Sequence, residues 1–254
     1  MTLGHVLSRP SGRDTVQHAG RTDILINIRP VNPMTIAIFP KPYLAAISSG
    51  MLLALTLHYP VMSWLAVLAL IPLLLVLLNS NLPLRQALLS GWLAGLIGYG
   101  FHFVYVAEAI SMGVFWGALA YYSLYVGVFA IGVAFCSRKS VEYGSIIAPC
   151  LWTALEYIRA HVLTGVQVGT LGATQAAVLP VVQIISVTGI FGLSFILVFI
   201  QVALTRLILL RRMGTLLSTA GWAGTAFLMI VGVLSYGVLA MWTPVSDGDT
   251  LTIA

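Results

Sequence analysis

Two ionisable side chains lie inside a largely apolar segment, and their types and spacing make them the first candidates for chemistry. Glu156 and Arg159 are three residues apart, so on a helix they share one face and can neutralise each other. Inside a membrane each such charge costs about 2.5 to 3.5 kcal/mol on insertion scales, so it needs a partner or a purpose. One interpretation is a structural ion pair that fixes the helix. The other is a substrate-binding site, in which Arg159 attracts a lipid phosphate or Glu156 orients a substrate group.

A long loop follows this segment and is the best candidate for a functional loop. Residues 164–180 are polar, rich in glycine and free of Lys and Arg, and Gln175 within them is a candidate substrate-binding residue. Tyr105 is a further candidate, because the aromatic side chains around it could hold acyl chains. Most of those aromatics are expected to serve in packing or in an interfacial belt.

The sequence predicts neither a catalytic group nor a metal site. Cys136 and Cys150 lie in or beside apolar segments, where a thiol usually behaves as a small hydrophobic group. The five His residues are scattered and no Cys-x-x-Cys occurs, so no metal ligand set is predicted. Because no phosphate loop or dinucleotide fingerprint is present, we expect no cofactor, and we predict no nucleic-acid partner.

The composition predicts an all-α polytopic membrane protein. The chain is 59% hydrophobic and 7% charged, with a mean hydropathy of +1.01, whereas soluble domains are about 25% charged. A helix needs about 20 mainly apolar residues to cross the hydrocarbon. Seven segments meet this length, at roughly 38–57, 61–79, 85–107, 112–136, 143–163, 181–206 and 215–241. Gly91, Gly95, Gly98 and Gly100 in the third segment predict close packing against a neighbouring helix.

The positions of the cations predict the orientation of these spans. If the N-terminus is cytoplasmic, seven crossings place eleven of the twelve Lys and Arg residues on the cytoplasmic side. These are Arg9, Arg13, Arg21, Arg29, Lys41, Arg85, Arg138, Lys139, Arg206, Arg211 and Arg212. Only Arg159 is left over, and the C-terminus emerges on the opposite side.

Three regions follow from this pattern. Residues 1–33 are polar, basic and interrupted by prolines, which predicts a disordered cytoplasmic arm. Residues 34–242 form the transmembrane bundle, and residues 243–254 form a tail on the far side. Because Met34 immediately precedes the first apolar run, translation could begin at Met1 or at Met34.

Several ordered motifs resemble those of the apolipoprotein N-acyltransferase family, over about residue 38 to the end. They comprise segments 118–130 and 148–159, Leu163-Thr164-Gly165, Leu171-Gly172-Ala173-Thr174-Gln175, and then Pro180, Gln183, Gly189, Gly192, Ser194 and Phe195. The resemblance implies a bacterial inner-membrane location with a cytoplasmic N-terminus and a periplasmic C-terminus. It also implies lipoprotein maturation, in which an acyl chain passes from a phospholipid to a diacylated lipoprotein.

In that family a nitrilase-like domain carries a Glu-Lys-Cys triad, which takes the acyl group as a thioester. The tail at 243–254 resembles the first strand of such a domain, and the triad would lie beyond residue 254. We therefore expect a truncated or split protein that is inactive alone. A separately encoded nitrilase-like domain is a possible partner.

Two other functions remain open at this point. The first is a non-catalytic membrane anchor or scaffold for a separately encoded enzyme, such as a polyprenol-phosphate mannose synthase. The second is a small-molecule transporter, which is disfavoured because few charges enter the spans and no matching pair of broken helices is obvious.

Overall fold

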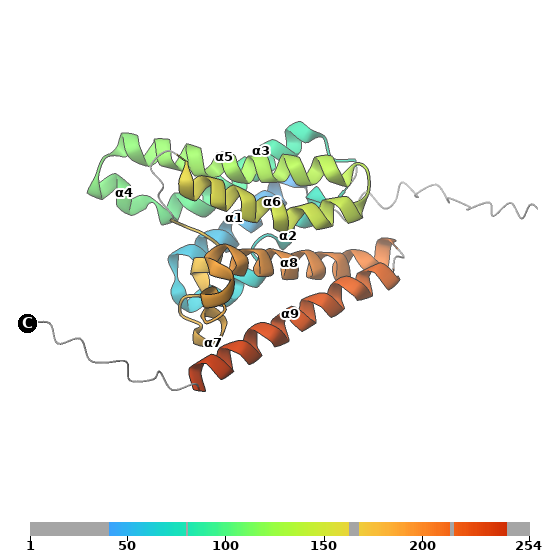
Figure 1. The fold of residues 1–254 in the computed structure, drawn as a ribbon. Helices are drawn as coiled ribbons and strands as arrows, with labels where there is room; N and C mark the ends of the chain where they lie inside the picture. The colour runs from blue at the N-terminus through green and yellow to red at the C-terminus, as the bar shows by residue number, and fades with distance from the viewer. Residues whose placement is uncertain (1–40, 80, 163–167, 214–215, 243–254) are drawn as a thin grey trace, which may run out of the picture. The chain divides into compact units, whose positions relative to one another are not determined.

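The computed structural model describes residues 41–79, 81–162, 168–213 and 216–242, and most of these residues are helical (Figure 1). In chain order the elements are α1 Pro42–His58, the 3-10 helix η2 Pro60–Val67, α2 Ile71–Leu77, α3 Leu84–His102, α4 Val104–Ala109, α5 Met112–Ser137, α6 Val141–His161, the 3-10 helix η3 Gly172–Gln175, α7 Leu179–Val182, α8 Ile185–Met213 and α9 Leu216–Trp242. The described ranges contain no strand, so the predicted all-α class is confirmed. The predicted arm at 1–33 and tail at 243–254 lie outside them.

The predicted membrane spans coincide with helices or with pairs of helices. In the described part of the chain, four segments are long and apolar enough to cross a membrane: Pro60–Leu77, Met112–Ser137, Ile185–Leu210 and Leu217–Trp242. The other three predicted spans correspond to α1, α3 and α6, which are shorter or more polar. These helices confirm a membrane bundle.

The second predicted span is broken rather than continuous. Between η2 and α2 the helix is interrupted, which leaves backbone N–H and carbonyl groups without helical partners. The fully buried Gln201 of α8 binds two of these groups. Its Oε1 accepts a hydrogen bond from the Leu70 N–H (2.7 Å), and its Nε2 donates one to the Ala66 carbonyl (2.8 Å). Ser49 Oγ of α1 accepts another from the Leu73 N–H (2.9 Å). The break is therefore buried and satisfied inside protein, as non-helical backbone within a membrane must be.

Glycines on α3 bring it close to α5, as their spacing predicts. A Cβ placed on Gly91 would lie 2.5 Å from the Val126 carbonyl oxygen, and one on Gly95 would lie 2.7 Å from Ser123 Cα. Gly98 packs against Leu53 of α1, whereas a Cβ on Gly100 would meet no described atom within 4 Å. The packing prediction is thus confirmed at three of the four glycines and wrong at Gly100.

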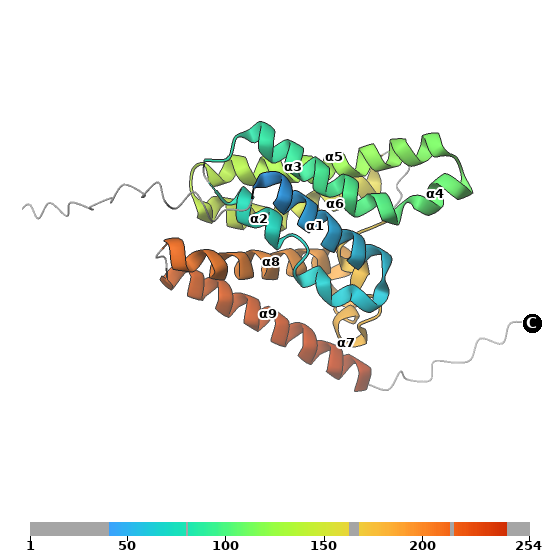
Figure 2. The ribbon, with the colours of Figure 1, turned by 180° about the vertical axis from the view of Figure 1, so that it is seen from behind.

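The chain reverses direction at two opposite ends of the described bundle, which we call the basic end and the loop end. At the basic end α3, α6 and α9 begin while α5 and α8 end, and Arg138 Nη2 donates a hydrogen bond to the Leu82 carbonyl (3.4 Å). At the loop end lie residues 168–178 and α7. Helices α8 and α9 meet at the basic end and diverge toward α7, as both ribbon views show (Figures 1 and 2). Only a small part of α9 is buried.

Candidate functional site

The candidate site is built on the last turns of α6. This helix begins at its N-cap Ser140, whose Oγ accepts hydrogen bonds from the N–H groups of Glu142 (3.0 Å) and Tyr143 (3.4 Å). The helix C-terminus favours the cation Arg159 in its final turn. Both Glu156 and Arg159 are buried, each 3% exposed. At this burial each charge must be stabilised by specific partners.

Glu156 binds a backbone N–H of the loop that follows α6. Its Oε1 accepts hydrogen bonds from the Leu171 N–H (2.7 Å) and from Trp152 Nε1, one turn earlier on α6 (2.9 Å). Hydrogen bonds to an ionised carboxylate are stronger than those between neutral groups. The carboxylate therefore fixes the loop backbone at residue 171.

Arg159 binds a carbonyl of the same loop. Its Nη2 donates to the Gly169 carbonyl (3.2 Å), and its Nη1 donates to Tyr99 Oη of α3 (2.7 Å). The guanidinium also lies over the ring of Tyr122, 4.4 Å from the centroid, where a cation–π attraction adds to its binding. Tyr99 Oη in turn lies 3.3 Å from the Gly169 carbonyl. We call Tyr99, Glu156 and Arg159 the loop clamp.

Gly169 adopts a conformation that suits glycine. Its φ is +65°, in the left-handed region, and a Cβ there would lie 2.9 Å from Tyr99 Cε1. The loop thereby turns so that the carbonyl of residue 169 faces Arg159 while the N–H of residue 171 faces Glu156. The local sequence and the clamp therefore favour the same backbone path.

The expected direct ion pair takes a different form in the structure. Among the described residues, the ion pair with a nitrogen–oxygen distance within 4.0 Å is Arg206–Glu142, and Glu156 and Arg159 form none. The physical reason is that each of these two charges is occupied by a backbone group of opposite polarity from the loop. They lie on one face, as predicted, and both bind residues 169–171.

Gln175 anchors the other end of this loop. Its Nε2 donates to the Ser63 carbonyl of η2 and to Thr174 Oγ1, both at 2.9 Å, and its side chain is buried. Between the two anchors, the Gly172 N–H donates to Ser194 Oγ of α8 (2.8 Å). Gln175 thus shares the loop with Glu156 and Arg159 but lies at a separate attachment point. Tyr105 falls in α4, and its side chain is outside the described residues.

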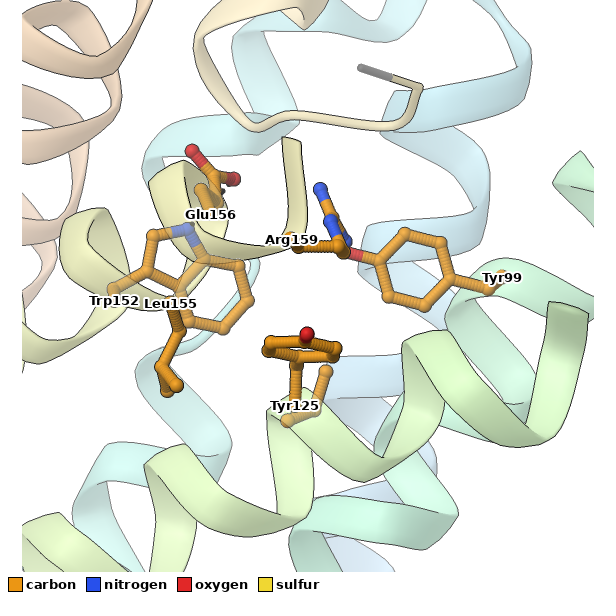
Figure 3. Close-up of a pocket in the computed structure, with 7 residues that line it drawn as sticks. Tyr99, Tyr125, Trp152, Leu155, Glu156 and Arg159 are labelled. Atoms are coloured by element: carbon orange, nitrogen blue, oxygen red, sulfur yellow. Dashed lines mark hydrogen bonds between the residues drawn. The ribbon is translucent and has the colours of Figure 1, made fainter. Parts of the chain in front are cut away.

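The space beside the clamp is small. A cavity of about 10 Å³ is lined by Tyr99, Tyr125, Val126, Trp152, Leu155, Glu156 and Arg159 (Figure 3). A single water molecule needs roughly this volume. The cavity cannot admit an acyl chain, so this geometry favours a positioning role for Glu156 and Arg159 over direct contact with a lipid.

Sequence reasoning missed several partners. Tyr99 had no signal beyond being aromatic in an apolar helix, whereas Trp152 and Ser194 lie within the family motifs, which do not indicate what they bind. Arg206 was predicted at the cytoplasmic end of a span, without a partner; in the structure it is only 4% exposed and binds Glu142. The only sequence signal was that Arg206 closes a long apolar run.

Comparison with known proteins agrees with the resemblance seen in the motifs. Residues 49–203 match the family model described as the apolipoprotein N-acyltransferase N-terminal domain. An apolipoprotein N-acyltransferase of Geobacter metallireducens is 37% identical over 185 residues, which cover 68% of this chain and 34% of that protein. The enzyme of the same name from Rickettsia prowazekii is 33% identical over 118 residues, covering 42% of this chain and 24% of the relative. That of Caulobacter vibrioides is 27% identical over 181 residues, covering 67% and 33%.

The matched region spans about a third or less of the length of these relatives. The residues matched by the family model, 49–203, include α3, α5 and α6, the loop clamp, the loop that the clamp holds and most of α8. The chain therefore belongs to the apolipoprotein N-acyltransferase family, through the N-terminal domain of that family.

Proposed function

We propose that the described bundle is the membrane part of a system that transfers an acyl chain from a phospholipid to a diacylated lipoprotein in the bacterial inner membrane. Its proposed task is to hold residues 168–175 as a rigid platform at the loop end, on the periplasmic side. Family membership supports the reaction class, and the absence of Lys and Arg from 164–180 supports the placement of the loop.

One observation carries this proposal: two buried, opposite charges on α6 hold neighbouring backbone groups of one loop. Buried ionic groups are expensive in a membrane. A loop that only connected two helices would not need them. A platform against which lipid and lipoprotein are positioned does, because small displacements of positioned reactants lower the rate strongly.

We further propose that the acyl-carrying thiol comes from outside the described helices. Cys136 lies in the last turn of α5 at the basic end, and Cys150 is exposed near the middle of α6. Neither is at the loop end. A nitrilase-like domain is the source that we propose for the thiol.

Membranes that contain this chain test the proposal directly. They would be incubated with phospholipid and a diacylated lipoprotein peptide, with and without a co-expressed nitrilase-like domain, and the peptide mass would be followed. We expect N-acylation only when that domain is present, and a loss of about a hundredfold in the Arg159→Met variant, comparable to other misplacements of reactants. Acylation by the chain alone, or full activity of a folded Arg159→Met variant, would contradict the proposal.

A further inference from the structure

A second hollow lies between α6, α8 and α9. This hollow, which we call the α6–α9 groove, has a volume of about 470 Å³ and is lined among others by Pro149 and Cys150 of α6, Phe199 of α8, and Ser218, Gly221 and Trp222 of α9. Its volume falls within the range of about 300 to 1,000 Å³ that ligand sites occupy. Because its walls are membrane-spanning helices and it is open on one side, it faces hydrocarbon.

The groove owes its depth to small residues on α9. A Cβ built on Gly221 would meet no described atom within 4 Å, so nothing fills the space in front of it. The rings of Phe199 and Trp222 stack with centroids 4.8 Å apart and form an apolar wall. The shape suits a slender apolar chain.

One end of the groove is polar and adjoins the ion pair of Arg206 and Glu142. Arg206 Nη2 lies 2.5 Å from Glu142 Oε1 and 2.6 Å from Ser218 Oγ, and Ser218 Oγ also donates to Glu142 Oε1. Trp222 Nε1 donates to Glu142 Oε2 (3.2 Å). Two of these groups, Ser218 and Trp222, line the groove itself.

This cluster is incompletely satisfied. The Glu142 side chain is 43% exposed, so its carboxylate can accept further hydrogen bonds from outside the protein. Arg206 is buried, and its Nε has no hydrogen-bond partner among the described residues. The Arg206 guanidinium is already bound to Ser145, Glu142 and Ser218, so the group left for a ligand is the exposed Glu142 carboxylate, which a cation would complement.

We propose that the α6–α9 groove binds one phospholipid of the leaflet at the basic end, with an acyl chain in the groove and, at the Glu142 end, a headgroup that carries a phosphate and a primary ammonium. The surrounding membrane supplies the apolar chain. The headgroup class follows from charge complementarity, since the ammonium matches the exposed Glu142 carboxylate and the phosphate matches the exposed Lys139, three residues earlier in the chain.

This lipid is distinct from any acyl donor at the loop. Glu142 and Glu156 are fourteen residues apart on α6, which corresponds to about 21 Å along the helix axis. The bound lipid would support α9, of which the protein itself buries little, by filling the space between it and α6. The inference therefore does not depend on acyl transfer.

Native mass spectrometry of the detergent-purified chain tests this binding with phosphatidylethanolamine, phosphatidylcholine and phosphatidylglycerol as probes. We expect one retained phosphatidylethanolamine, bound about tenfold more tightly than either other lipid, and a loss of this preference in Glu142→Gln. Equal retention of all three lipids would overturn the headgroup assignment.

Two substitutions fill the groove from opposite walls, Gly221→Leu from α9 and Cys150→Phe from α6, and both are expected to abolish retention. Gly232→Leu is the matched control, because a Cβ on Gly232 also meets open space but this residue does not line the groove. Retention by both groove variants would overturn the proposal. So would equal loss in the Gly232→Leu control.

The exposed thiol of Cys150 gives a readout that needs no groove variant. In a Cys136→Ser background, phosphatidylethanolamine should slow maleimide labelling of Cys150 about tenfold relative to phosphatidylglycerol. Disulfide-linked dimers through Cys150 in native membranes would instead show that a second copy of the chain occupies the groove.

Discussion

Glu156 and Arg159 bind opposite polar groups of one loop: the carboxylate takes the Leu171 N–H at 2.7 Å and the guanidinium takes the Gly169 carbonyl at 3.2 Å. Each charge compensates a backbone dipole as well as balancing the other. Removal of either one leaves a buried charge and an unpaired backbone group together.

Arg159→Met should therefore destabilise the bundle strongly, by roughly 3 kcal/mol, because Glu156 loses its compensating cation in a buried site. Unfolding in mild detergent, followed by the Tm, measures the loss. The double variant Glu156→Gln, Arg159→Met should lose less than the sum of the two single variants, since no uncompensated charge remains. Strict additivity would argue against coupling. Arg85→Met, at an exposed cation, is the control and should leave the Tm unchanged.

Gly169→Ala should destabilise the loop by about 1 to 2 kcal/mol, because alanine is strained at a φ of +65° and its Cβ would press on Tyr99. Limited proteolysis at the loop, together with the Tm, would report the change. Gly100→Ala is the matched control: it is helical and open, so it should be neutral or slightly stabilising. Equal effects at the two glycines would refute the role assigned to the turn.

Gln201→Met should leave the Leu70 N–H and the Ala66 carbonyl unpaired within the membrane. Each buried unpaired group costs about 1 to 3 kcal/mol, so the summed loss in the free energy of unfolding should be several times that of a surface change. The Tm in detergent and amide hydrogen exchange near residue 70 measure it. Gln86→Met, at an exposed position of α3, supplies the control. Unchanged exchange at residue 70 would contradict the assigned hydrogen bonds.

The predicted orientation can be checked with reporters. Alkaline phosphatase is active only outside the cytosol, so a fusion after Trp242 should be active and a fusion after Lys139 inactive. A fluorescent protein that matures only in the cytosol should give the reverse pattern. An active phosphatase after Lys139 would overturn the alternation on which the periplasmic placement of the loop depends.

Much of the fold was predictable because bilayer thickness imposes a length on apolar segments. Hydropathy placed most span ends within a few residues and marked 164–180 as the unusual loop, although α8 continues to Met213, beyond the predicted end at 206, and the third span is divided between α3 and α4. Hydropathy alone did not predict the break between η2 and α2, although Pro72 at the start of α2 is a residue that interrupts helices. The side chain that stabilises the break, Gln201, lies on a distant helix and has no local signal.

The candidate site was predictable only in part, since a charge within a span is visible in the sequence and its partner is not. The pattern drew attention to Glu156 and Arg159, and their spacing suggested that they bind each other. The loop backbone that they hold is far enough along the chain that no periodicity reports it. Arg206 shows the same limit, because its partner Glu142 lies 64 residues away.

The amide of Gln201 also has a consequence for biogenesis. It supplies the hydrogen bonds that the backbone near residues 66 and 70 cannot form for itself, and it lies 131 residues further along the chain than Leu70. During synthesis the early segment thus enters the bilayer well before its stabilising side chain leaves the ribosome. Until α8 is inserted, the Leu70 N–H and the Ala66 carbonyl need other hydrogen-bond partners. The second span therefore reaches its final structure only after α8 has entered the membrane.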